Sequence, residues 1–233
     1  MQKYSLLEED SREFKNIISQ MEMSLSSQQR IINELQQDVM KIRMVPIDVL
    51  FKRLPRIVRE LSKQMSKMVK LDVYGETTEL DKIVIEQITD PIMHIMRNMV
   101  DHGLESPQER KEKGKPAYGT IEVSAYHRGN QVVIELADDG RGIDIEKIRQ
   151  KVVEKNIANQ HDAEKMTKSE LLNMLYHPGF STTKQVSMTS GRGVGMGVVK
   201  ANITKIGGII EIDTETDSYT CFTIKIPLTL AVI

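Results

Sequence analysis

The chain has 233 residues, 39% hydrophobic and 28% charged, with a formal net charge of −1 at pH 7. This balance indicates a soluble globular chain and gives no reason to expect nucleic acid or an acidic membrane surface as a partner. The single cysteine, Cys221, excludes an internal disulfide and fits a reducing compartment such as the cytoplasm. No apolar run approaches the roughly 18 residues of a membrane span. The acidic start, MQKYSLLEED, is no signal peptide, so we expect no membrane insertion.

The first 44 residues contain neither Pro nor Gly, and they carry apolar residues at alternating spacings of four and three. Gln28 interrupts this series, whose apolar members are Phe14, Ile18, Met21, Leu25, Ile32, Leu35, Val39 and Ile42. A heptad seam of this length predicts one helical rod of roughly 50 Å whose apolar stripe needs a partner. We expect this stem (1–44) to form a homodimer. Packing on its own domain is one alternative, and a hairpin turn at SLSSQQ (24–29) is another.

Residues 45–233 mix predicted helices and strands in an order typical of a two-layer α/β sandwich of the α+β class. Helices are predicted from Pro55 to Val69, from about residue 81 with an interruption before Pro91, over 94–103, from about 144, up to Tyr176, and over 198–206. Strands are predicted at 71–76, 120–128, 131–139, 209–213 and 221–227. Gly129-Asn130 would form a tight turn between two of them.

The stretch HIMRNMVDHG (94–103) carries an unusual polar face. On a helical wheel, one side is isoleucine, methionine and valine, and the other is His94, Arg97, Asn98, Asp101 and His102. A solvated face is the common explanation, but such a face normally carries flexible Lys and Glu. These shorter, more directional groups suit a polar ligand or a metal ion. The helix alone leaves both interpretations open.

Two segments rich in glycine follow. In DDGRGID (138–144), Asp138 would stand at a strand end, where a carboxylate can accept a hydrogen bond from an exocyclic amine, and the glycines would let a ligand approach. In SGRGVGMGVVK (190–200), alternating glycines open a helix, and free N–H groups with the helix dipole attract phosphate. This is neither a P-loop nor a Rossmann fingerprint. An acidic turn and a flexible linker are the plain alternatives, and HPGFSTTK (177–184) alone is an ordinary loop.

Taken in order, the asparagine helix, Asp138 and the glycine loop resemble the nucleotide pocket of the GHKL ATPases, whose fold is also called the Bergerat fold. The resemblance is closest to the catalytic domain of the CheA family of chemotaxis histidine kinases, in HIMRNMVDHGLESPQERKEKGKP, DDGRGID, GFSTT, SGRGVGM and FTIKIPLTLAVI. KIRMVPI (41–47) is similar to the join between that family's dimerisation helices and catalytic domain. The resemblance covers about residue 30 to the C-terminus.

The resemblance implies transfer of the ATP γ-phosphate, with Mg²⁺, to a histidine on a separate phosphotransfer domain. In a full-length kinase it also implies a coupling protein, a chemoreceptor and a response regulator as partners, and a receptor-associated place in the cytoplasm. Asn98 would bind Mg²⁺, and Asp138 would bind the adenine amino group. His94 stands where relatives that hydrolyse ATP often carry a glutamate base, and residues 157–192 would form the ATP lid.

The expected catalytic residues are therefore His94, Asn98 and Lys147, of which Lys147 would lie near the phosphates. The expected ATP-binding residues are Asn98, Asp101, His102, Asp138, Gly140, Gly142, Ile143, Ser181, Thr182, Thr183, Gly191, Arg192, Gly193, Val194, Gly195 and Met196. None of the five histidines resembles the family's phosphate acceptor, so the acceptor is expected on another domain.

The chain departs from the family in three places. Gly197 stands where the family usually has aspartate, DSYTC (217–221) replaces a Gly-rich turn, and one stem helix is evident where the family has two. We find no phosphotransfer or coupling domain and expect a kinase core, either excised or encoded as a short protein. Two alternatives remain. His94 in place of glutamate argues against an ATPase of the gyrase or MutL kind, whereas Gly197 and Tyr219 favour a catalytically decayed scaffold that binds nucleotide.

Overall fold

The structure, a computed structural model, describes residues 2–177, 180 and 195–228, and the chain divides into two compact units, 1–44 and 45–233. The first unit is the single helix α1 (Gln2–Arg43), which continues through SLSSQQ as the heptad phase predicts. Several apolar seam residues are exposed along it, namely Ile18, Met21, Leu25, Ile32, Leu35 and Ile42. None of the helices in the described residues is long and apolar enough to cross a membrane.

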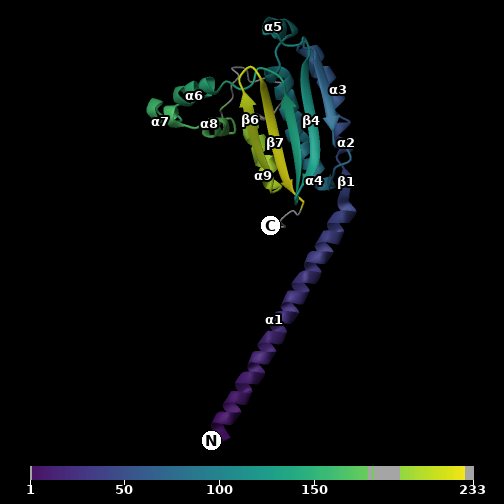
Figure 1. Ribbon diagram of the computed structural model, residues 1–233, viewed down its shortest axis with the longest axis vertical. Helices are drawn as coiled ribbons and strands as arrows, with labels where there is room; N and C mark the ends of the chain where they lie inside the picture. The colour runs from purple at the N-terminus through teal and green to yellow at the C-terminus, as the bar shows by residue number, and fades with distance from the viewer. Residues whose placement is uncertain (1, 178–179, 181–194, 229–233) are drawn as a thin grey trace. The chain divides into compact units, whose positions relative to one another are not determined.

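The second unit contains a five-stranded sheet in the order β2-β4-β5-β7-β6 (Figure 1). Its strands are β2 (Val69–Tyr74), β4 (Gly119–Arg128), β5 (Gln131–Asp138), β6 (Ile209–Glu215) and β7 (Tyr219–Pro227). The pair β2–β4 is parallel, and the other neighbouring pairs are antiparallel. A separate two-stranded sheet joins β1 (Met44–Pro46) to β3 (Glu79–Asp81).

Helices cover one face of the five-stranded sheet and extend beyond its β6 edge (Figure 1). They are α2 (Asp48–Phe51), α3 (Leu54–Gln64), α4 (Lys82–Asn98), α5 (Pro107–Glu112), α6 (Ile145–Glu154), α7 (Gln160–Lys165), α8 (Lys168–Met174) and α9 (Met196–Lys205). A π-helical turn, η1 (Met99–Gly103), continues α4.

The main core lies between the sheet and this helical layer. The apolar stripe of α4 is fully buried there, and so are the inward-facing residues of the central strands. Members of this core with no exposed surface include Ile88, Ile92, Ile95, Met96, Val123, Ile134 and Ile224. The arrangement confirms the predicted two-layer α/β sandwich of the α+β class. A smaller apolar cluster holds α6, α7 and α8 together through Ile148, Val152, Ala163, Leu171, Leu172 and Phe180.

Two local predictions were wrong. The helix at Pro91 is not interrupted, because α4 runs from Lys82 to Asn98 with the proline inside it. An internal proline costs about 3 kcal/mol, but each neighbouring isoleucine that becomes fully buried returns about 1.5–3 kcal/mol. The helix from Pro55 does not reach Val69: α3 ends at Gln64, and Ser66 takes a left-handed φ of 50° before β2 begins.

Candidate functional site

The polar face of residues 94–103 ends in the π-helical turn η1, which a distant lysine holds. The Lys67 ammonium donates to three main-chain carbonyl oxygens, those of Val100 at 2.8 Å, Asp101 at 2.5 Å and Leu104 at 2.8 Å. Carbonyls at a helix end have no partner within the helix, so Lys67 satisfies groups that burial would otherwise make costly. Burial also lowers the pKa of Lys67. This role could not be predicted from the sequence, because Lys67 lies in an ordinary charged segment.

Asn98, the predicted Mg²⁺ ligand, lies at the last residue of α4 and contacts the first residue of α9. Its Nδ2 donates to the Met196 Sδ at 3.4 Å. With the nitrogen so engaged, the side-chain oxygen is the atom able to coordinate a cation. The described residues contain no cluster of three or more His, Cys, Asp or Glu that could hold a metal. A single amide oxygen suits Mg²⁺, because proteins usually bind that ion through one or two side chains together with phosphate and water rather than in an all-protein cage.

The histidines of this segment differ in their surroundings. His94 is half-buried, and burial, followed by the charges of Arg97 and His102, lowers its pKa. Its imidazole is therefore neutral at pH 7 and able to accept a proton. His102 is exposed, and its Nε2 lies 3.5 Å from the carboxylate of Asp101.

Asp138 ends β5 and is buried, with 3% of its surface exposed. The Gly140 N–H donates to its Oδ1 at 3.0 Å. Burial raises the pKa of Asp138 to about 7; the nearby carboxylates of Asp139 and Glu105 add to this, while the Gly140 N–H and Lys115 oppose it. A buried carboxylate at a strand end has few donors of its own, which suits it to accept a hydrogen bond from a ligand.

Two glycines bring Asp138 against the end of η1. A Cβ on Gly103 would lie 3.0 Å from the Asp138 Oδ2, and a Cβ on Gly140 would lie 2.2 Å from the Gly103 carbonyl oxygen. That same oxygen accepts the Arg141 N–H at 2.9 Å. Any side chain at 140 would force the two segments apart. The turn after β5 is thus packed against the end of η1, the π-helical turn that continues the helix carrying Asn98.

Gly142 and Ile143 connect the same turn to the β6–β7 hairpin. Gly142 has a left-handed φ of 64°, and a Cβ there would lie 2.1 Å from the Glu215 carbonyl oxygen. The Ile143 N–H donates to the Thr214 Oγ1 at 2.9 Å. Glycine is therefore required at 142 both for its backbone conformation and for close packing.

The remaining predicted site residues are placed less directly. Lys147 lies in the first turn of α6 with a side chain 76% exposed, and its ammonium pairs with Asp144 at 3.1 Å. Gly195 is the N-cap residue of α9, and Met196 begins that helix. The others lie outside the described residues: Ser181, Thr182, Thr183, Gly191, Arg192, Gly193 and Val194.

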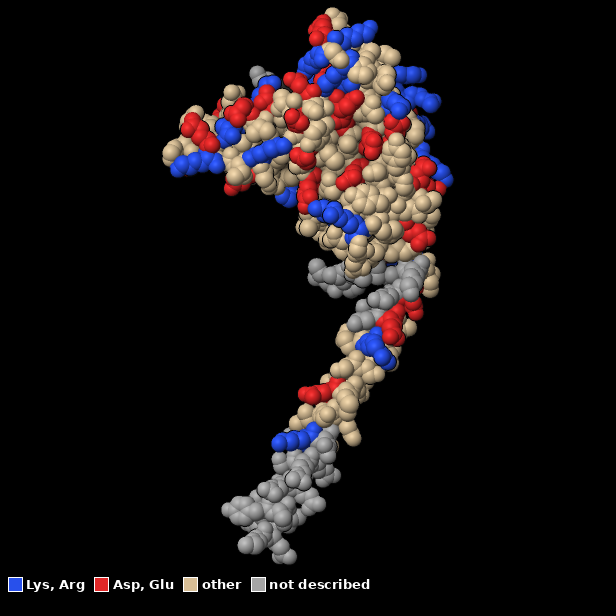
Figure 2. Space-filling view, in the orientation of Figure 1, with Lys and Arg blue, Asp and Glu red and all other residues tan. Residues whose placement is uncertain are grey.

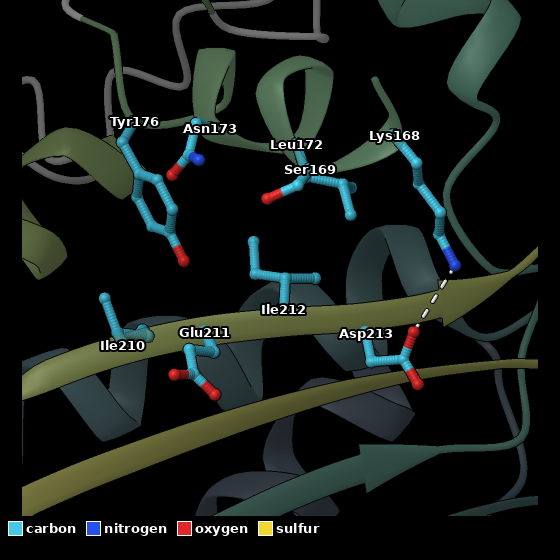
Figure 3. Close-up of a pocket in the computed structure, with 9 residues that line it drawn as sticks. All are labelled: Lys168, Ser169, Leu172, Asn173, Tyr176, Ile210, Glu211, Ile212 and Asp213. Carbon is cyan, nitrogen blue, oxygen red and sulfur yellow. Dashed lines mark hydrogen bonds and ion pairs between the residues drawn. The ribbon is translucent and has the colours of Figure 1, made fainter.

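A cavity of about 330 Å³ lies between α8 and β6, and sequence reasoning did not anticipate it (Figure 3). Lys168 and Asp213 form an ion pair of 3.3 Å at one end. At the other end the buried Tyr176 directs its hydroxyl into the cavity, where it has no hydrogen-bond partner among the described residues. The Tyr176 main chain also meets α9, since a Cβ on Gly197 would lie 2.6 Å from its carbonyl oxygen.

Comparison with known proteins gives consistent matches. Residues 87–230 match the family described as histidine kinase-, DNA gyrase B-, and HSP90-like ATPases. The chain is 47% identical over 232 residues to the sensor histidine kinase CheAY of Helicobacter pylori, which is 99% of this chain and 28% of that protein. It is 48% identical over 219 residues to the chemotaxis protein CheA of Treponema pallidum, covering 94% of this chain and 27% of that protein.

A solved mycobacterial sensor histidine kinase, MprB, superposes with a TM-score of 0.48 at 13% identity, over 79% of this chain and 95% of that one. The chain spans little more than a quarter of the length of the two curated relatives.

Proposed function

We propose a function for this chain, which belongs to the family of histidine kinase-, DNA gyrase B-, and HSP90-like ATPases. It is the ATP-binding catalytic core of a chemotaxis histidine kinase of the CheA type. In this proposal it transfers the γ-phosphate of ATP to a histidine on a separate phosphotransfer domain. One observation carries the proposal: close glycine contacts hold the buried Asp138 carboxylate against Gly103, at the end of the π-helical turn η1 that continues the helix of Asn98.

The proposed roles follow from the chemistry of each group. Asp138 accepts a hydrogen bond from the adenine amino group. The Asn98 oxygen holds Mg²⁺, which, when bound, neutralises charge on the phosphate oxygens. The neutral His94 polarises or accepts the proton of the attacking nitrogen. Residues proposed to line the nucleotide are Asp101, His102, Gly140, Gly142, Ile143, Lys147, Ser181, Thr182, Thr183, Gly191, Arg192, Gly193, Val194, Gly195 and Met196.

The proposed partners rest on the relatives and on α1. The exposed apolar seam of α1 supports a homodimer formed through that helix. The names of the relatives, a chemotaxis protein and a sensor histidine kinase, support a chemoreceptor, a coupling protein and a response regulator in the full-length system. The free thiol of Cys221 fits the reducing cytoplasm as the place where this core works.

The test is transfer in trans. The chain is incubated with γ-labelled ATP, Mg²⁺ and a separately prepared phosphotransfer domain, with a second acceptor that lacks its histidine as the control. Acid-labile label on the intact acceptor alone is the expected result. Release of ADP at the same rate without any acceptor would favour an ATPase, and tight ATP binding without transfer would favour a scaffold. Acid-labile label on the chain itself would overturn transfer in trans.

A further inference from the structure

Arg110 is buried although it lies among exposed cations. Lys and Arg side chains gather on the surface around α5 (Figure 2), yet the Arg110 side chain is 1% exposed. The capping box between Ser106 and Glu109 begins α5 and fixes the helix that carries this arginine. A buried guanidinium must have its donors satisfied, so its partners show what it holds.

Those partners lie in the turn after β5. The Arg110 Nη2 donates to the Asp139 carboxylate at 2.9 Å, and the Nη1 donates to the Asp139 carbonyl oxygen at 3.1 Å. The Nη1 also lies 3.1 Å from the Glu105 carboxylate, which is equally buried. The Nε donates to the carbonyl oxygen of Pro116 at 2.7 Å. The guanidinium therefore donates hydrogen bonds to both the main chain and the side chain of Asp139, the residue next to Asp138.

Lys115 adds a second cation to the same turn. Its ammonium donates to the carbonyl oxygens of Asp139 at 3.0 Å and Gly140 at 2.6 Å, and to Glu105 at 3.1 Å. The other oxygen of the Asp139 carboxylate accepts the Thr120 N–H at 2.8 Å. Glu105 thus accepts hydrogen bonds from Arg110 and Lys115, and these two cations fix the two residues that follow Asp138. Gly103 packs against the Asp138 carboxylate itself.

We propose that Arg110, held by Glu105 and assisted by Lys115, is a positioning residue that orients the Asp138 carboxylate toward the adenine amino group. This inference rests on the proposed function. Stability alone is a weak reason for such a network, since buried ion pairs are often no more stabilising than apolar residues of similar volume. The planar fork of arginine also fits here in a way that lysine cannot reproduce, because it reaches the Glu105 carboxylate, the Asp139 carboxylate and two carbonyl oxygens at once.

The experiment measures discrimination between ATP and inosine triphosphate, which has a carbonyl oxygen in place of the amino group. Binding is measured by calorimetry with Mg²⁺ at pH 8.5, where Asp138 is ionised. We expect the wild-type chain to prefer ATP by roughly tenfold or more, as for a hydrogen bond to a charged group. Arg110→Lys should lose most of this preference and approach Asp138→Asn, with inosine triphosphate affinity unchanged within about threefold.

Arg149→Lys is the matched control, because Arg149 also pairs with a carboxylate, that of Glu146, and donates to a main-chain oxygen, that of Ala163. It should retain the wild-type preference. Asp139→Ala removes the side-chain partner of Arg110 and should repeat the loss if Arg110→Lys does not fold. A folded Arg110→Lys with the wild-type preference would overturn the inference. Failure of the wild-type chain to bind either nucleotide would instead overturn the proposed function.

Discussion

Replacing Asp138 with asparagine should stabilise the fold at pH 8 and weaken ATP binding at the same pH. The carboxylate is 3% exposed, and burial raises its pKa from 3.8 to about 7. Above pH 7 the carboxylate is ionised, and its charge is unfavourable for folding at this buried position. We propose, however, that the ionised carboxylate is the form that accepts a hydrogen bond from the adenine amino group. The two effects of one substitution should therefore have opposite signs.

The size of the stability effect follows from linkage. A shift from 3.8 to about 7 is about three pKa units, which corresponds to about 4 kcal/mol of unfolding free energy as an upper figure. Because the folded-state pKa is raised, the protonated carboxyl is the form that the fold favours. Its contribution to the free energy of unfolding is fully present below about pH 4 and is lost as the pH rises through 7. Asparagine does not titrate. The free energy of unfolding of Asp138→Asn relative to wild type should rise by several kcal/mol between pH 4 and pH 8.

The binding effect follows from the same pKa. About one tenth of the carboxyl groups are ionised at pH 6 and about nine tenths at pH 8, so the ATP affinity of the wild-type chain should rise about tenfold over this interval. The phosphates of ATP also titrate in this range. Asp138→Asn has the same phosphate contribution without the carboxylate and serves as the control.

Two measurements check this reasoning. Urea titrations followed by circular dichroism from pH 4 to pH 8 give the unfolding free energies of both chains. Calorimetry with Mg²⁺ and ATP at pH 6, 7 and 8 gives the affinities. Parallel pH profiles for wild type and Asp138→Asn in either measurement would refute the buried, titrating carboxylate as the source of the effect.

Three further predictions concern other parts of the chain. His94→Gln should keep ATP affinity within a few fold but reduce transfer to an added phosphotransfer domain by roughly 10²-fold, and equal transfer rates would remove the proposed role. Ile32→Glu with Leu35→Glu should place charges in the α1 seam and give monomers by light scattering, whereas a monomeric wild-type chain would contradict the stem prediction. Gly197→Ala should lower the free energy of unfolding by about 1–3 kcal/mol, because its Cβ would lie 2.6 Å from the Tyr176 carbonyl oxygen. Gly195→Ala is the control, since a Cβ there meets nothing within 4 Å, and an equal loss in both variants would contradict the packing explanation.

The sequence predicted those elements whose residue pattern repeats with a clear period. The heptad spacing predicted α1, and the alternation in 120–128 and 131–139 predicted β4 and β5. Prediction failed at Pro91, where tertiary burial outweighs a local penalty, and it missed α7, where Ala163 is the one apolar residue and no periodic pattern exists. Short capped helices of this kind depend on side-chain caps, here Asn159, more than on an apolar stripe.

The residues of the candidate site also fall into those that the sequence could predict and those that it could not. Asp138 and its glycines were predictable, because a carboxylate at a strand end and the loss of Cβ atoms are local features. Lys67 and Arg110 were not, because their importance comes from partners distant in the sequence. Arg110 lies in ERKEKGK (109–115), a run that is indistinguishable from a solvated surface, and it is buried against a turn whose Asp139 lies 29 residues further along the chain. The effect of a proline or glycine on its own backbone can be predicted from the local sequence. The role of a buried cation can be predicted only once its partners are known.

The structure also changes the weight of two departures from the family. By sequence alone Gly197 favours a decayed scaffold, because it removes a carboxylate. Any larger residue there would collide with the Tyr176 carbonyl oxygen, however, so glycine has a packing reason. The DSYTC turn is likewise satisfied, since Asp217 takes the left-handed φ of 61° that a glycine would otherwise supply, and the Tyr219 hydroxyl donates to Asp213 at 2.6 Å. Aspartate tolerates that conformation better than most residues. Both departures thus preserve the hairpin and the start of α9 beside Asn98, and neither counts as evidence of lost catalysis. The distinction between a kinase and a scaffold therefore rests on phosphoryl transfer to the acceptor histidine.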